Sequence, residues 1–400
     1  MRYSWEVPRT GYPGRVNISS LTSVAETTLK PAFQHNADSL NKNDDTCQRQ
    51  DDHRAVGPWD PKLSPASLRR GLKLMMTQRS LDERMEAMQR QGRLSFYVKS
   101  SGEEAVAIAQ GMALEDRDIL FPSYRQPGLQ LVRGRSVVDM MCQYITNSRD
   151  NNKGRQIPGH YNWNEGNFVS VSSPVGTQFP QAVGCAMASA SRGEDTVTAT
   201  WIGDGATAEG DFHNAIVFAA AYRPPVILNV VNNQWAISTP QSFARGSATF
   251  AARGLGYDIP SLRVDGNDFP ALFSVTAWAA ERARRGGGPS LIEVFTYRAG
   301  PHSTSDDPSG YRPRDEAAHW PLGDPIERLK THLIQRGEWS QSRHTQLQAQ
   351  LKAEMSARYK EAESYGTLKD GPLAPKSTLF DDVYKALPPH LRKQRQAFGY

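Results

Sequence analysis

The stretch that decides the fold, residues 197–233, reads VTATWIGDGATAEGDFHNAIVFAAAYRPPVILNVVNN. Its first six residues, 197–202, are rich in β-branched and aromatic side chains and predict a strand that ends at the turn Gly203-Asp204-Gly205. A helix is expected over residues 211–222, and two prolines separate it from a run at 226–231 that is apolar except at Asn229. Strand, helix and strand in this order predict a parallel sheet, whose strands are buried on both faces.

The same alternation continues toward the C-terminus. Residues 262–264 and 291–296 are expected to be strands on either side of a helix over 269–285. This repetition implies an α/β protein in which helices cover both faces of a parallel sheet.

Two helices are expected before this region. Ser64 is a suitable N-cap for a helix in which leucines and methionines recur at helical spacing, and Glu103-Glu104 would open a second helix over residues 102–114. The methionine-rich face of the first helix is interpreted as core or subunit contact rather than a cofactor pocket.

Three segments are predicted. Residues 1–60 are expected to form an irregular N-terminal arm, because residues 35–60 contain few large apolar side chains, although Tyr3, Trp5 and Phe33 could anchor the arm on a partner. Residues 61–325 are expected to form the α/β domain. Residues 326–400 are expected to form a helical C-terminal extension that ends in a basic tail around 391–395.

Composition excludes two classes of protein. The 47 basic and 42 acidic side chains leave a net charge of only +5, spread along the chain without a basic stripe or interleaved aromatic residues, so nucleic-acid binding is not expected. The longest apolar run, residues 215–222, is eight residues long, whereas a membrane-spanning helix needs about 20. A membrane protein is therefore not expected either.

The cysteines and the N-terminus bear on location. Cys47, Cys142 and Cys185 form no C-x-x-C pair, which argues for a reducing compartment and against a disulfide framework or a zinc site. Cys142 and Cys185 are expected to be packing thiols. The first 36 residues contain no apolar segment typical of a secretory signal. We expect a cytoplasmic protein, with the mitochondrial matrix as the alternative.

Polar residues follow two of the predicted strands directly. Asp204 lies in the turn after the first strand, and Asn233 lies just beyond the second. Because the carboxyl ends of neighbouring parallel strands lie side by side, the two side chains can meet there. A carboxylate, an amide oxygen and a backbone carbonyl suit magnesium, which usually keeps phosphate oxygens or waters as further ligands. The pattern indicates a magnesium–diphosphate site; the alternative is two unrelated turns.

A family resemblance makes this interpretation specific. The turn Gly203-Asp204-Gly205, followed after 27 intervening residues by Asn233, looks like the motif of thiamin-diphosphate enzymes. Four segments resemble the α subunit of the thiamin-diphosphate-dependent decarboxylase component of branched-chain 2-oxoacid dehydrogenase complexes. Their residues are 203–213, 232–239, 263–268 and 297–307. The resemblance covers about residues 55–395 and implies the thiamin-diphosphate-binding fold.

The resemblance implies roles for individual residues. Magnesium would be bound by the side chains of Asp204 and Asn233 and by the carbonyl of Trp235. The following residues would lie at the thiamin diphosphate: Tyr124, Arg125, Ser173, Gly205, Ala206, Arg298 and His302. His302 would be catalytic, holding the diphosphate and moving protons near the reacting carbon; the alternative is an ordinary histidine of a surface loop.

A potassium site is also implied. The loop 172–178 resembles the structural potassium loop of the family, with Ser172, the Pro174 carbonyl, Thr177 and Gln178 as ligands. The alternative is an ordinary turn that precedes a helix over 178–191.

Two positions depart from or extend the mitochondrial pattern. Val231 stands where mitochondrial members have an arginine before the two asparagines, so one phosphate contact is absent or supplied elsewhere. Ser303 matches the serine that a kinase modifies in mitochondrial members, but no such regulation is expected in a bacterial protein.

The resemblance also implies partners. In this family the glutamate that activates the pyrimidine ring comes from a β subunit, and no residue here is assigned that role. We therefore expect an α2β2 heterotetramer that is active only when assembled, that acts on a small 2-oxoacid and that passes the acyl group to a lipoyl-bearing transacylase.

Other functions are weighed against this one. The α subunit of a pyruvate or acetoin dehydrogenase is the first alternative, and a non-catalytic scaffold is a remote one. A nicotinamide-binding dehydrogenase would need a third glycine where Ala208 stands. Phe96 and Tyr97 are either residues of the acyl pocket or core packing.

Overall fold

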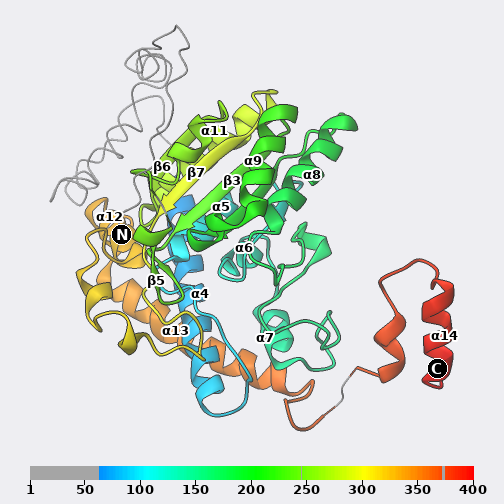
Figure 1. Cartoon of the computed structure of the whole chain (residues 1–400). Coiled ribbons are helices and arrows are strands. Elements are labelled where there is room, and N and C mark those ends of the chain that lie inside the picture. The colour runs from blue at the N-terminus through cyan, green and yellow to red at the C-terminus, as the bar shows by residue number, and fades with distance from the viewer. Residues whose placement is uncertain (1–62, 245, 372–373) are drawn as a thin grey trace, which may run out of the picture.

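A computed structural model of the chain describes residues 63–244, 246–371 and 374–400 (Figure 1). The predicted arm, residues 1–60, and Cys47 lie outside the described residues. Within the described part, one parallel sheet has the order β1 (Ile119–Phe121), β2 (Thr198–Gly203), β3 (Val226–Asn232), β7 (Ser290–Phe295), β6 (Ser261–Asp265). A short antiparallel hairpin, β4 (Trp235–Ala236) and β5 (Thr239–Pro240), follows β3. The predicted α/β class with a parallel sheet is confirmed.

Helices surround the sheet (Figure 1). The α-helices are α4 (Pro65–Arg90), α5 (Glu104–Ala113), α6 (Gly128–Val132), α7 (Val137–Ile145), α8 (Gln178–Ser191), α9 (Gly210–Tyr222), α10 (Ala252–Leu255), α11 (Phe269–Arg284), α12 (Pro325–Gln335), α13 (Gln341–Glu363) and α14 (Pro389–Ala397). Short 3-10 turns are η1 (Asn164–Gly166), η2 (Gly205–Ala208), η3 (Gln241–Phe243), η4 (Pro308–Gly310), η5 (Glu316–His319) and η6 (Lys376–Phe380).

The side-chain alternation of β3 divides the core in two. Ile227 and Val231 point into a cluster that includes residues of α4, α5 and α11, whereas Leu228 and Val230 point into a second cluster built on α8 and α9. Successive side chains of a strand point to opposite faces, so a strand that is apolar at nearly every position is covered on both faces. The expectation that helices lie on both faces is confirmed.

The helix α4 belongs to the larger cluster. Ser64 caps it, since its hydroxyl accepts a hydrogen bond from the Ser67 backbone N–H at 3.1 Å. Its buried positions include Met75, Met85 and Met88, so the methionine-rich face is core. Leucines of α12 and α13 lie in the same cluster, and these two helices are therefore packed onto the body of the protein.

A buried polar bridge joins α5 to the sheet. The Gln110 amide donates to Asn229 Oδ1 of β3 at 2.7 Å and accepts from the Trp201 indole N–H of β2 at 2.6 Å. Asn229 donates in turn to the Thr200 carbonyl at 3.0 Å. Because unpaired polar groups are costly in a core, these partners explain how an asparagine stands in the middle of an apolar strand.

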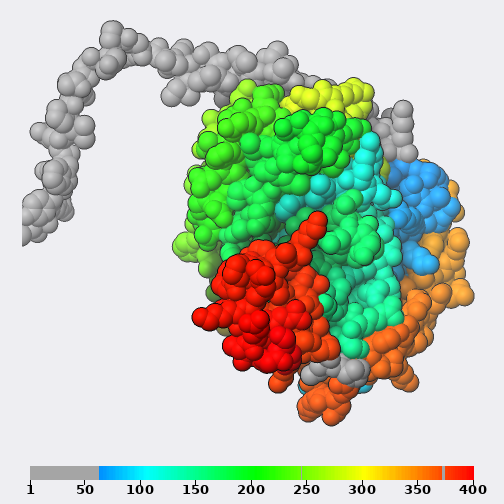
Figure 2. Space-filling model, turned by 90° about the vertical axis from the view of Figure 1, so that its right-hand side faces the viewer, coloured from blue at the N-terminus to red at the C-terminus, as the bar shows by residue number. Residues whose placement is uncertain are grey.

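The predicted strands and helices agree with the structure to within about two residues, and the structure adds elements that the sequence analysis does not predict, among them α6, α7, α10 and the β4–β5 hairpin. Strand β1 was not predicted, because three residues carry too weak a pattern to be recognised. The predicted basic tail lies within helix α14, and the segment before it is held to the loop around Arg155 through the carbonyls of Thr378 and Asp381 (Figure 2).

Two further expectations concern exposure and membranes. Cys142 is buried and Cys185 is half-buried, and neither is in a disulfide, as expected for packing thiols. In the part of the chain that the structure describes, no helix has the length and apolar character needed to cross a membrane.

Candidate functional site

The site is built where β2 and β3 end. The register pairs Gly203 with Val231, and the Asp204 backbone N–H donates to the Val231 carbonyl at 3.1 Å. The carboxylate of Asp204 is thereby held at the end of β3, where it is 1% exposed. Its Oδ1 accepts from the Gly205 N–H at 2.7 Å, whereas its Oδ2 is buried without a hydrogen-bond partner. Burial raises the pKa of Asp204 to about 6.

Asn233 directly follows β3, the strand that pairs with β2, and hydrogen bonds orient its amide group. Its Nδ2 donates to Glu103 Oε1 at 2.8 Å, and its Oδ1 has only a long contact, 3.4 Å, from the Trp235 backbone N–H. The Trp235 carbonyl accepts from Arg298 at 3.0 Å. Asp204, Asn233 and Trp235 are thus brought to one place by the ends of two adjacent strands and the hairpin that follows.

The oxygen set matches a hard cation. No group of three or more His, Cys, Asp or Glu side chains that could hold a metal occurs in the described ranges. One carboxylate with an unpartnered oxygen, one amide oxygen and one carbonyl suit magnesium, which usually takes phosphate oxygens or waters as its remaining ligands. The residues present therefore fit a magnesium–diphosphate group.

Gly205 is required by a close approach. A Cβ atom placed on Gly205 would lie 2.4 Å from the Cβ of Ala236 in β4, so the hairpin covers the turn that carries Asp204. Ala206 is buried directly after it. Any larger residue at position 205 would push the hairpin, and with it the Trp235 carbonyl, away from the site.

Two buried arginines form a cationic wall. Arg298 is 1% exposed and donates to the carbonyls of Trp235 and Ile237 at 3.0 and 2.7 Å, while its Nε is buried without a partner. Arg125 is also buried and donates to the Lys99 carbonyl at 2.5 Å and to the His302 carbonyl at 3.0 Å. Guanidinium groups suit multidentate phosphate binding, so this wall fits a diphosphate.

His302 lies between the two arginines. Its Nδ1 is 3.3 Å from Arg125 and 3.4 Å from Arg298, and the edge of its ring meets the Tyr124 ring with 5.8 Å between centroids. Its backbone N–H donates to Asp306 at 2.7 Å. Burial, and then the charges of Arg125 and Arg298, lower the pKa of His302 to about 4. The imidazole is therefore neutral at pH 7, and its Nδ1 is an acceptor facing cations.

This environment predicts a pH response. His302 should remain neutral until about pH 4, and the Arg298→Gln substitution should raise its pKa because one neighbouring cation is removed. Since the folded pKa is below the ordinary value, the unfolded chain binds more protons, and the stability from this group should be lost as pH falls from about 6.5 to about 4. The imidazole NMR resonance, assigned with His302→Asn, measures this. Titration near 6.5 in the folded protein would contradict it.

The loop 172–178 lies beside the Asp204 turn. A Cβ on Gly176 would be 3.4 Å from Glu209 and 3.6 Å from the Ala206 carbonyl, and Thr177 contacts Asp211 at 3.3 Å. Gln178 donates to the Trp201 carbonyl at 2.8 Å, which leaves its buried Oε1 without a partner. Ser172 contacts Gln181 instead, and Ser173 and Pro174 are exposed. An unpartnered amide oxygen here fits a cation ligand.

Sequence reasoning missed one member of the site. The sequence pattern indicates Glu103 as a charge at a helix N-terminus, whereas in the structure it is 1% exposed and contacts both Asn233 and Arg125. Burial raises its pKa to about 7. The partners come from segments about 20 and 130 residues away, so the local pattern carried no signal for this role. Of the two alternatives for Tyr97, the structure supports core packing: the side chain is buried, and its hydroxyl donates to buried Asp82 at 2.7 Å.

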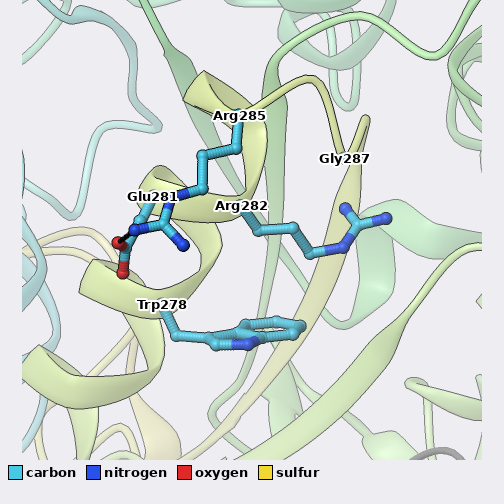
Figure 3. Close-up of a pocket in the computed structure, with 5 residues that line it drawn as sticks. All are labelled: Trp278, Glu281, Arg282, Arg285 and Gly287. Atoms are coloured by element: carbon cyan, nitrogen blue, oxygen red, sulfur yellow. Dashed lines mark ion pairs between the residues drawn. The ribbon is translucent and has the colours of Figure 1, made fainter.

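A separate hollow does not belong to this site. Trp278, Glu281, Arg282, Arg285 and Gly287 line a space of about 270 Å³ at the end of α11 (Figure 3). It precedes β7 and therefore lies at the amino ends of the strands, whereas ligands of parallel sheets bind at the carboxyl ends. Arg282 donates there to the carbonyls of Gly288 and Pro289, so it stabilises the turn.

Comparisons with known proteins agree with this geometry. The model of the dehydrogenase E1 component family matches residues 72–370. The chain is 56% identical over 350 residues to the 2-oxoisovalerate dehydrogenase subunit alpha of Pseudomonas aeruginosa, covering 87% of this chain and 85% of that protein. It is 41% identical over 341 residues to the mitochondrial subunit alpha of Bos taurus, covering 85% of this chain and 74% of that protein. The chain therefore belongs to the dehydrogenase E1 component family, where it groups with the α subunits of 2-oxoisovalerate dehydrogenases.

Proposed function

We propose that this α subunit binds the magnesium–diphosphate end of thiamin diphosphate at the carboxyl ends of β2 and β3, for oxidative decarboxylation of branched-chain 2-oxoacids. The observation that carries the proposal is a convergence of three features: the buried Asp204 carboxylate, whose Oδ2 has no hydrogen-bond partner, the Asn233 amide, whose Oδ1 has only the 3.4 Å contact from the Trp235 N–H, and the cationic wall of Arg125 and Arg298. The family generally uses thiamin diphosphate, and its α subunits of this type act with a β subunit.

Each residue has a role suited to its chemistry. Asp204, Asn233 and the Trp235 carbonyl would hold magnesium, while Arg125, Arg298 and Tyr124 would bind the diphosphate together with Ser173, Gly205 and Ala206. When bound, thiamin diphosphate supplies the carbanion that attacks the 2-oxo carbon and the ring that accepts electrons as carbon dioxide leaves. His302 would act as a neutral imidazole that holds the diphosphate and exchanges a proton near the reacting carbon.

A structural potassium ion is part of the proposal. Ser172, the Pro174 carbonyl, Thr177 and Gln178 would supply an all-oxygen set, and the unpartnered Oε1 of Gln178 supports it. Potassium there would stabilise the loop that lies against Ala206 and Glu209.

The proposed assembly rests on the family to which the chain belongs. A β subunit in an α2β2 heterotetramer would supply the glutamate for the pyrimidine ring, and a lipoyl-bearing transacylase would take the acyl group. We propose cytoplasmic location in a bacterium. The division into an arm (1–60), a cofactor-binding domain (61–325) and a helical extension (326–400) is also part of this proposal.

Calorimetric titration tests the function. Thiamin diphosphate with magnesium is titrated into the chain alone and into the chain co-expressed with its β partner, and decarboxylation of 3-methyl-2-oxobutanoate is compared with that of pyruvate. We expect binding and activity only in the assembled protein, with the branched substrate preferred. Failure of the assembled protein to bind the cofactor would refute the proposal, and a preference for pyruvate would refute the substrate class.

A further inference from the structure

We propose that Glu103 is a positioning residue that orients the Asn233 amide, so that the amide oxygen faces the magnesium position, and that it ties this end of the site to Arg125. The inference rests on the function proposed above, because it concerns how this chain prepares the metal ligand that the function requires. It does not follow from the strand-end pattern, since Glu103 lies outside both strands.

The contact itself selects one orientation of the amide. Glu103 Oε1 accepts from Asn233 Nδ2 at 2.8 Å. An amide group has an acceptor oxygen on one side and a donor NH2 on the other. Glu103 Oε1 accepts on the Nδ2 side, and the Trp235 backbone N–H lies 3.4 Å from Oδ1, so both neighbours favour the same orientation. A flipped Asn233 would place oxygen against oxygen in a buried site, which is costly. Glu103 therefore directs Asn233 Oδ1 away from itself, on the side left for a cation.

The position of Glu103 is fixed by its backbone. The preceding Gly102 has φ +92°, and a Cβ on it would lie 2.4 Å from the Tyr297 carbonyl. The Thr296 hydroxyl donates to the Gly102 carbonyl at 3.2 Å, and the Ala299 N–H donates to Ser101 at 3.0 Å. The turn that carries Glu103 is thus clamped to the segment that also carries Arg298.

Glu103 also connects the proposed metal ligands of the site with its proposed diphosphate ligands. Its Oε1 is 3.6 Å from Arg125 Nε, and Arg125 in turn holds His302 through its carbonyl at 3.0 Å. Its second oxygen, Oε2, is buried without a partner. One buried carboxylate therefore touches a proposed metal ligand and a proposed diphosphate ligand, and its removal should disturb the metal side most, where its hydrogen bond is shortest.

The test compares two substitutions in the assembled α–β protein. Glu103→Leu removes the acceptor, whereas Glu103→Gln keeps an oxygen that can accept from Asn233 Nδ2, and the Trp235 N–H at Asn233 Oδ1 still favours that orientation of the two amides. With saturating thiamin diphosphate, Glu103→Leu should weaken magnesium binding by about 10- to 100-fold, the range typical for residues that orient metal ligands. Glu103→Gln should stay within about 3-fold of wild type, since the hydrogen bond is retained. Calorimetric magnesium titration measures both, and cofactor affinity at saturating magnesium should change little.

A matched control is the carboxylate that binds the neighbouring asparagine, Asn232, at the end of β3. Glu293 is a buried carboxylate that accepts from Asn232 Nδ2 at 2.8 Å, but it is outside the proposed ligand set. Glu293→Leu should lower thermal stability and leave magnesium affinity at the wild-type value. If Glu103→Leu does not assemble, Glu103→Ala replaces it, because the smaller side chain admits water to Arg125.

Three outcomes would overturn the inference while leaving the proposed function standing. The first is that Glu103→Leu binds magnesium with wild-type affinity. The second is that Glu103→Leu and Glu103→Gln lose magnesium affinity to the same extent. The third is that Glu293→Leu loses as much magnesium affinity as Glu103→Leu. The proposed function fails separately, when the assembled wild-type protein itself does not bind thiamin diphosphate with magnesium.

Discussion

Asp204→Ala is expected to abolish magnesium-dependent binding of thiamin diphosphate in the assembled protein. Asp204 is the carboxylate of the proposed metal set, and its unpartnered Oδ2 is buried at the end of β3. Residues that only orient a metal ligand cost about 10- to 100-fold when lost, so removal of the charged ligand should cost more than about 100-fold in magnesium affinity. Decarboxylation of 3-methyl-2-oxobutanoate should fall in parallel. Calorimetry at rising magnesium and a decarboxylation assay measure the two losses.

Graded controls separate ligand loss from damage to the fold. Asp204→Asn keeps an oxygen but removes the charge, and it should give an intermediate loss. Asn233→Ala should resemble Asp204→Ala, because both side chains serve the same ion. Glu209→Ala changes an exposed carboxylate in the same segment, and this variant should bind magnesium and thiamin diphosphate with wild-type affinity. Cofactor binding that survives both Asp204→Ala and Asn233→Ala would show that the diphosphate is held elsewhere.

Asp82→Ala is expected to destabilise the protein strongly, on the order of 4 kcal/mol. The Asp82 carboxylate is fully buried and accepts four hydrogen bonds: from Tyr97 Oη at 2.7 Å, Gln78 Nε2 at 2.8 Å, the Ser100 N–H at 2.8 Å and Ser100 Oγ at 3.0 Å. Alanine would leave these donors buried without an acceptor. Because Ser100 begins the turn that carries Glu103, cofactor affinity should fall as well. Chemical denaturation of the assembled protein measures the change in stability.

A smaller substitution tests the hydrogen-bond explanation. Tyr97→Phe removes one of the four donors and keeps the ring in the core, so it should cost about 1–2 kcal/mol. The loss for Asp82→Ala should therefore be clearly larger. Equal losses for the two variants would mean that the carboxylate contributes little beyond its contact with Tyr97.

The sheet and the meeting of its strand ends could be predicted from the sequence. Residues 197–202 and 226–231 are β-rich or apolar at nearly every position, and the helix pattern between them requires a parallel crossover. The register that pairs Gly203 with Val231 confirms that the two strand ends are neighbours. The ligand roles of Asp204 and Asn233 rest on the family resemblance and stay predictions.

The partners within the site could not be predicted in this way. Arg125 and His302 are 177 residues apart and meet because the loops after β1 and β7 converge at the same edge of the sheet. β1 itself is too short to be recognised, and nothing local in Gly102-Glu103-Glu104 indicates that Glu103 faces Asn233.

What the sequence by itself determined is therefore the periodic part of the protein: strands, helices, their parallel order and the polar residues at the strand ends. Periodicity is a local property, set by which side chains can be buried every second or every third to fourth residue. Only the tertiary structure decided which buried charges touch one another, because contacts such as Glu103 with Asn233 and Arg125 depend on how separate segments pack. Those contacts set the orientation of the Asn233 amide and the neutral state of His302.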